Sequence, residues 1–159
     1  MTEQEKAGME ECVRRYADMV YRLAYSYVKN RADAEDVFQE TFLRLVQKNP
    51  RFESEEHCKA WLLHVTANCA KNHLHSAWNR HTQPLEEWNA AQLSPEELHL
   101  EEALSQLTPD YRAVIHLHYF EGYKTEEIAR ILGCRPSTIR SRLKRARERL
   151  AHLLKEDFA

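Results

Sequence analysis

Positively charged side chains gather near the end of this 159-residue chain in a pattern suited to nucleic acid. Residues 135–149 contain seven arginines and lysines and one acid, Glu148, whereas the whole chain carries a formal net charge of −2. Positive charge confined to one segment indicates a local polyanionic partner, and DNA phosphate is the obvious one. Arginine also suits base reading, because its planar fork matches the O6 and N7 acceptors of guanine.

The residues around this segment predict a helix-turn-helix. Thr125 is expected to cap a first helix, with two glutamates behind it where a helix N-terminus favours negative charge. Gly133 suits a turn that needs positive φ, and Pro136 suits the first position of the next helix. Apolar residues recur at helical spacing in that second helix, so its polar residues share the opposite, solvent-facing side. They are Ser137, Arg140, Ser141, Lys144 and Arg145.

The composition indicates a protein built from helices. The chain is 43% hydrophobic and 30% charged, with three glycines, and its five prolines lie between periodic segments or at helix starts. No apolar run reaches the length of a membrane span, and the N-terminal residues are too polar and acidic for a secretory signal. We therefore expect a cytoplasmic protein without direct membrane insertion.

The four cysteines are scattered and form no CxxC pair, so a disulfide scaffold is not expected. Cys69 and His73 lie four residues apart, with Cys58 and His64 nearby, but this spacing matches no closed zinc motif. We expect no metal and no cofactor, and thiols that pack as small apolar side chains. The sequence does not separate buried thiols from redox-sensitive ones.

The periodicity divides the chain into two helical blocks. In residues 10–78, Asp33 is expected to cap a second helix and Ser54 a third that runs to about residue 78. Residues 79–93 are polar and lack a clean period, so they are interpreted as a flexible linker. In residues 94–155, Ser94 opens the block with a capping-box pattern, and four helices follow. The fold expected is all-α: two small helical domains, the second containing the helix-turn-helix.

Three segments in this order resemble the extracytoplasmic-function (ECF) sigma factors of bacterial RNA polymerase. The segments are ADAEDVFQETFLRL, FESEEHCKAWLLHVTANCAKN and LTPDYRAVIHLHYFEGYKTEEIARILGCRPSTIRSRLKRARERL. The resemblance covers residues 10–154 and implies two domains, region 2 and region 4. It also implies an initiation factor that catalyses nothing, and the sequence contains no P-loop, HExxH or nucleophile elbow.

The resemblance implies a role for particular residues. In region 2, one set matches positions that contact the clamp helices of the largest polymerase subunit: Asp36, Gln39, Glu40 and Phe42. A second set matches the loop that accepts a flipped base and the helix that recognises the −10 element: His57, Asn68, Lys71 and Asn72. In region 4, the positions expected at the −35 element are Ser137, Thr138, Arg140, Ser141, Arg142, Lys144 and Arg145. Trp61, in the −10 helix, is expected to pack in the core rather than to stack on a base.

The partners implied are core RNA polymerase, through the clamp helices and the subunit that contacts region 4, and promoter DNA. An anti-sigma factor is also implied, which would cover these surfaces and could hold the protein at a membrane. Three other classes of protein compete with this one. A dimeric repressor or response-regulator output domain leaves residues 10–78 unexplained. A nucleic-acid-processing enzyme lacks a catalytic constellation, and a protein-interaction adaptor does not explain the basic helix. Binding of core polymerase separates the sigma-factor hypothesis from all three.

Overall fold

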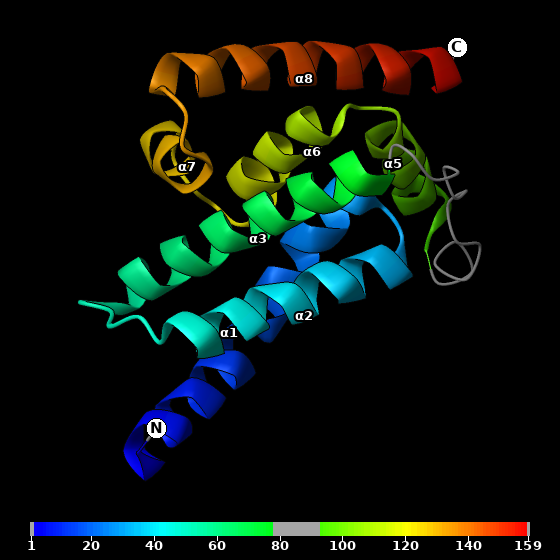
Figure 1. The fold of residues 1–159 in the computed structure, drawn as a ribbon. Coiled ribbons are helices and arrows are strands. Elements are labelled where there is room, and N and C mark those ends of the chain that lie inside the picture. The colour runs from blue at the N-terminus through cyan, green and yellow to red at the C-terminus, as the bar shows by residue number, and fades with distance from the viewer. Residues whose placement is uncertain (1, 78–92, 159) are drawn as a thin grey trace. The chain divides into compact units, whose positions relative to one another are not determined.

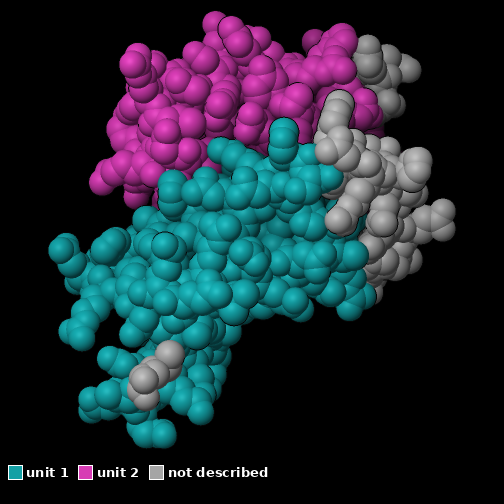
Figure 2. Space-filling view, in the orientation of Figure 1, with its two compact units in different colours: residues 1–82 teal, residues 83–159 magenta. Residues whose placement is uncertain are grey.

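The computed structural model describes residues 2–77 and 93–158, and within these ranges it contains helices and no strand (Figure 1). The predicted all-α fold is confirmed. The chain divides into two compact units, residues 1–82 and 83–159 (Figure 2). Residues 79–92 of the predicted linker lie outside the described residues. None of the helices described combines the length and the apolar character needed to cross a bilayer.

The first unit is a three-helix bundle of α1 (Glu3–Val28), α2 (Arg31–Lys48) and α3 (Glu55–Ala77), each packed against the other two. Two threonines lie inside this bundle: the Thr41 hydroxyl donates to the Val37 carbonyl at 2.9 Å, and Thr66 donates to Leu62 at 2.6 Å. Both polar groups are thereby satisfied without leaving the core. The largest fully buried side chains around them are Val20, Leu23, Tyr27, Val37, Leu45, Leu62 and Leu63.

The helix starts in this unit correct two expectations. α1 begins at Glu3 behind a Thr2 capping box, well before residue 10, because its first turns are polar and carry no apolar period. The predicted cap at Asp33 is wrong: Asn30 is the N-cap, and its side-chain oxygen accepts from the Asp33 N–H at 2.8 Å. Ser54 does cap α3, since its hydroxyl accepts from the His57 N–H at 3.1 Å.

The second unit consists of α5 (Pro95–Ser105), α6 (Pro109–Ile115), the π-helix η1 (His116–Phe120), α7 (Thr125–Leu132) and α8 (Pro136–Phe158). α8 packs against α5, α6 and α7, and the capping box at Ser94 is present as predicted. The π-helical turn was not predicted. It closes with the Glu121 N–H donating to the His116 carbonyl at 3.0 Å, an i→i+5 bond.

A buried arginine holds the start of α6. The Arg112 guanidinium donates to the Leu107 carbonyl, in the turn between α5 and α6, and burial lowers the pKa of Arg112 to about 10. At that pKa the group stays charged at neutral pH, so the carbonyl partner stabilises a cation inside the core. This bond fixes the connection that precedes the helix-turn-helix.

Candidate nucleic-acid and polymerase interfaces

The turn of the helix-turn-helix has the geometry expected from its residues. Gly133 ends α7 in the left-handed region, with φ 69°, and its N–H donates to the Ala129 carbonyl. Pro136 is the first residue of α8. The expectation that Thr125 caps α7 is wrong, because Thr125 is the first helical residue and residue 124 is the N-cap. The Lys124 N–H donates to the Glu127 carboxylate at 3.0 Å, which is the bond that the N3 glutamate makes in a capping box.

α8 separates apolar from polar residues along its length. Ile139, Leu143 and Ala146 are buried beneath it. Ser137, Arg140, Ser141, Lys144 and Arg145 are all exposed. They repeat at intervals of three and four residues, so they form one stripe on the helix surface. The stripe combines cations with hydroxyls, a set that can bind both phosphates and base edges.

Two other residues expected to contact DNA at this surface are less accessible to a ligand. Thr138 and Arg142 are partly buried, and Arg142 Nη1 lies 3.6 Å from the Cys134 sulfur in the turn. Arg147, farther along, donates to the Tyr119 hydroxyl at 3.1 Å and so joins α8 to η1. The exposed stripe, rather than every arginine of α8, is therefore the part that is free to meet a ligand.

A small aromatic cluster follows α2 in the first unit. The Phe52 ring lies 5.4 Å from the His57 ring and 5.7 Å from the Trp61 ring, both in edge-on geometry. The Glu53 N–H donates to His57 Nδ1 at 3.2 Å, which ties the loop to the first turn of α3. Trp61 is partly buried, so it is neither fully in the core nor free to stack on a base. These ring contacts and this hydrogen bond thus anchor the loop to the first two turns of α3.

Farther along α3, Asn68, Lys71 and Asn72 share one face, because they are spaced by three and four residues. Asn72 is exposed, while Asn68 and Lys71 are partly buried. The Asn68 amide nitrogen lies 3.1 Å from His64 Nε2, so this amide already has an intrahelical partner.

The face of α2 differs from the one expected. Asp36, Gln39 and Glu40 are exposed, but Phe42 is only 8% exposed and its ring packs 4.9 Å from that of Phe38. Phe42 therefore belongs to the bundle core and is not an accessible aromatic anchor. The large apolar side chains that are exposed on this helix are Leu43, at 51%, and Val46, at 48%. Sequence reasoning missed both as surface residues, because apolar residues occur on more than one side of α2.

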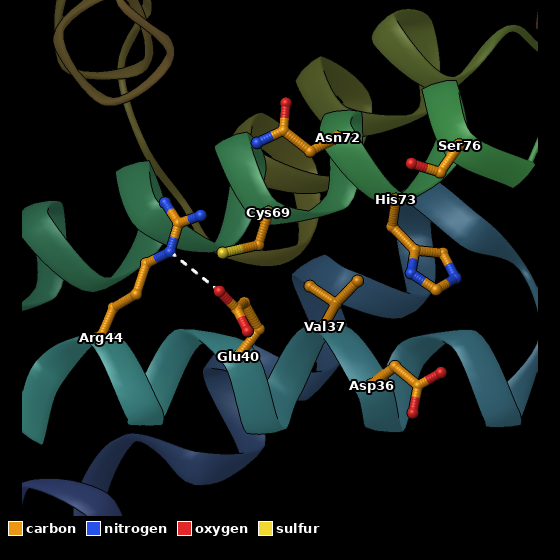
Figure 3. A pocket seen from close by; sticks show the side chains of 8 residues that line it. All are labelled: Asp36, Val37, Glu40, Arg44, Cys69, Asn72, His73 and Ser76. Atoms are coloured by element: carbon orange, nitrogen blue, oxygen red, sulfur yellow. Dashed lines mark hydrogen bonds and ion pairs between the residues drawn. The ribbon is translucent and has the colours of Figure 1, made fainter.

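A pocket of about 360 Å³ brings together residues that the sequence assigned to different roles (Figure 3). Asp36 and Glu40 of α2 and Asn72 of α3 are among the residues that line it. Glu40 pairs with Arg44 at 3.2 Å along the helix. The Cys69 thiol lines the same pocket, and burial raises the pKa of this thiol. The residues expected at the polymerase and at the −10 element are thus neighbours across the α2–α3 seam.

One cross-helix bond at this pocket was not foreseen. His73 Nε2 lies 2.8 Å from Asp33 Oδ1, although 40 positions separate the two residues. Each of Asp33, Asp36 and His73 offers a ligand-type atom, and these atoms lie within 4.8 Å of one another. The sequence spacing only places His73 four residues after Cys69, and the structure shows that its ring contacts a carboxylate of α2. The bond joins the two helices that carry the pocket.

Comparison with known proteins identifies the family. The model for sigma-70 region 2 matches residues 12–80, and the model for sigma-70 region 4 matches residues 98–150. RNA polymerase sigma factor SigV of Bacillus subtilis is 31% identical over 161 residues, which cover 97% of this chain and 96% of SigV. The chain belongs to the ECF sigma factors. The first unit carries region 2, and the second carries region 4.

Two further comparisons agree with this assignment. ECF RNA polymerase sigma factor SigE of Mycolicibacterium smegmatis is 34% identical over 157 residues, and the match spans 91% of this chain and 61% of SigE. Sigma factor RpoE of Bartonella quintana, solved in complex with the anti-sigma factor NepR, is similar with a TM-score of 0.73 at 26% identity. That match covers 92% of this chain and 96% of RpoE.

Proposed function

We propose that this ECF sigma factor binds core RNA polymerase, directs it to a restricted set of promoters and helps to open the start site. The observation that carries the proposal is the exposed basic stripe of α8, which follows a glycine turn in a chain that also contains region 2. A repressor needs the stripe but has no use for region 2. In this proposal the protein works in the cytoplasm and by binding alone, and the polymerase performs all the chemistry.

Region 4 would recognise the −35 element through α8. Arg140 and Arg145 are exposed in the N-terminal half of α8, about one turn and about two and a half turns from its start, and the N-terminal part of a recognition helix contacts base edges. Lys144 and the two serines of the stripe suit phosphate and base contacts beside them. Arg142, which is partly buried against Cys134, is assigned to a supporting phosphate contact.

Region 2 would recognise the −10 element through the loop before α3 and through α3 itself. The Phe52 ring, which packs edge-on against Trp61, can support a flipped base, and the His57 ring lies beside it. Asn72 is exposed on the helix and can read a base edge, while Lys71 can hold a phosphate.

α2 would contact the polymerase clamp. Asp36, Gln39 and Glu40 offer exposed polar groups for such an interface. Because Phe42 is buried, we assign the apolar part of the contact to Leu43 and Val46, which are exposed on the same helix. A polar surface with a small apolar centre is typical of interfaces that form and dissociate.

Control by an anti-sigma factor is part of the proposal. RpoE, which is similar to this chain over 92% of its length, was solved with the anti-sigma factor NepR. An inhibitor that covers α2 and α8 would block the polymerase and the DNA together. Such an inhibitor could hold the protein at a membrane, although the chain would not insert into it.

Transcription in vitro tests the proposal. Core polymerase with this protein should initiate from a few members of a promoter library, and Arg140→Ala with Arg145→Ala should abolish this selectivity. Lys155→Ala is the matched control, since Lys155 is an exposed cation on the same helix beyond the stripe. Failure of the wild-type protein to bind core polymerase would refute the proposal and favour the repressor. Equal loss in the Lys155 variant would show that total charge, rather than the stripe, controls recognition.

A further inference from the structure

Two thiols that are far apart in sequence meet inside region 2. Cys12 lies on α1 and Cys58 in the first turn of α3, 46 positions later, and their sulfur atoms are 3.3 Å apart. The sulfurs of a disulfide are about 2.05 Å apart, so they would have to approach by about 1.3 Å.

A pocket gives small molecules access to this pair. Both cysteines line a cavity of about 440 Å³ whose walls also include Gly8 of α1 and Arg51 of the loop after α2. Gly8 and Arg51 are exposed, so the cavity opens to solvent. It has room for hydrogen peroxide or a small organic hydroperoxide.

The two thiols differ in a way that assigns them different parts in an oxidation. Cys12 is half-buried, whereas Cys58 is only 6% exposed. Burial, followed by the adjacent Cys12 thiol, raises the pKa of Cys58 to about 12. Cys58 therefore stays protonated at neutral pH, and the more accessible Cys12 meets the oxidant first.

We propose that Cys12 and Cys58 are a modification site for hydroperoxides and form a reversible intramolecular disulfide that fastens α1 to the start of α3. The Cys12 sulfur attacks the outer oxygen of the hydroperoxide as its own proton leaves. The O–O bond breaks, Cys12 becomes a sulfenic acid, and the departing alkoxide or hydroxide takes up that proton and leaves as the alcohol or water. The Cys58 sulfur then attacks the sulfenic sulfur, the S–S bond forms, and the S–O bond breaks. The departing oxygen takes the Cys58 proton and leaves as water, so two thiols lose two electrons to one hydroperoxide.

The position of Cys58 extends the effect of the bond to the neighbouring loop. The Cys58 N–H donates to the Ser54 carbonyl at 3.1 Å, and Ser54 caps α3. The next residue back, His57, holds the loop through Glu53. A covalent link from this turn to α1 thus restrains the loop as well as the bundle. The formation of this disulfide does not depend on the promoter role proposed above.

The other two cysteines provide the comparison. Cys134 is partly exposed in region 4, next to Arg142, and Cys69 is buried at the pocket between α2 and α3. Oxidation of a thiol without a second thiol beside it adds oxygen instead of forming an intramolecular bond. The Cys134→Ser variant therefore keeps the proposed site intact and removes an accessible thiol.

Mass spectrometry of the full-length protein tests the proposal directly. After treatment with hydrogen peroxide and alkylation, the digest should contain a peptide that links Cys12 to Cys58, and dithiothreitol should restore both thiols. The melting temperature of region 2 should rise by about 10 °C on oxidation, because the bond closes a long loop in the unfolded chain. Cys12→Ser should lose the linked peptide and the rise in melting temperature, and Cys134→Ser should retain both.

Three results would overturn the proposal. The first is addition of oxygen to Cys12 while Cys58 stays reduced, and the second is a disulfide between two molecules. The third is a linked peptide whose formation leaves the melting temperature unchanged. If Cys12→Ser does not fold by circular dichroism, Cys58→Ala takes its place, and the peptide map of the wild-type protein decides the chemistry in either case.

Discussion

Replacing Phe42 by alanine tests whether this residue packs in the core of region 2 or contacts the polymerase. The side chain is 8% exposed and packs 4.9 Å from the ring of Phe38. Truncating a buried phenylalanine costs about 3 to 5 kcal/mol, since it removes apolar burial and leaves a cavity. In a domain of this size each kcal/mol lowers the melting temperature by about 4 to 8 °C. We therefore expect region 2 of Phe42→Ala to melt roughly 15 °C or more below the wild type.

The neighbouring Leu43 provides the matched control. Leu43 is 51% exposed on the same helix, so Leu43→Ala should change the free energy of unfolding by no more than about 0.5 kcal/mol. If Leu43 contacts the polymerase, the same variant should weaken the binding of core enzyme by about fivefold or more, which corresponds to about 1 kcal/mol.

The two variants are compared by thermal unfolding, followed by circular dichroism, and by titration with fluorescently labelled core polymerase. The binding titration is made well below the melting temperature of each variant, so that loss of fold and loss of contact are separated. A stable Phe42→Ala protein that nonetheless fails to bind polymerase would refute our assignment of this ring to the core. It would restore Phe42 as the anchor that the resemblance implied.

Four smaller predictions follow from local geometry. Gly133→Ala should lower the free energy of unfolding of region 4 by about 1 to 2 kcal/mol in chemical denaturation, because φ is 69° there. Ser54→Ala should cost region 2 about 1 kcal/mol in the same measurement, through loss of the bond to the His57 N–H, and Ser54→Gly only a few tenths. Lys144→Ala should weaken promoter binding for all sequences alike and reduce the slope of log affinity against log salt by about 1, as expected for one phosphate contact. The pKa of Cys58 is about 12 in the folded protein and about 9 in the unfolded chain, so the unfolded chain loses the thiol proton at a lower pH. The free energy of unfolding of reduced region 2 should therefore fall as the pH rises from about 9 towards 12. Cys58→Ala should flatten that part of the pH profile, and an unchanged profile would contradict the buried thiol.

Much of region 4 could be predicted because its signals are local. The turn at Gly133 needs a backbone conformation that glycine adopts without strain, and Pro136 has the φ of a first helical residue. The solvent-facing stripe of α8 follows from helical period alone, because its apolar residues lie on one side and its cations on the other. The capping hydroxyl of Ser54 is likewise read from the few residues that follow it.

α2 shows where this reasoning fails. Its apolar residues include Val37, Phe42, Leu43 and Val46, which do not all lie on one side of a helix. The helical period therefore does not decide which of them face the core. Only the packing of α1 and α3 against the helix decides that Phe42 is inside and that Leu43 and Val46 are outside. The misplaced cap at Asp33 is a smaller case, since Asn30 and Asp33 both have side chains that favour a helix start.

The sequence by itself determined the all-α fold class, the basic second helix of the helix-turn-helix and the family. Periodicity, turn residues and charge are local signals, each contained within a few neighbouring positions of the chain. The tertiary structure alone decided which thiols meet and which histidine reaches which carboxylate. Cys12 and Cys58 are 46 positions apart, and Asp33 and His73 are 40 apart. Such contacts depend on the angle and register at which α1, α2 and α3 pack, and these are set by the fit of the whole buried surface rather than by any local pattern.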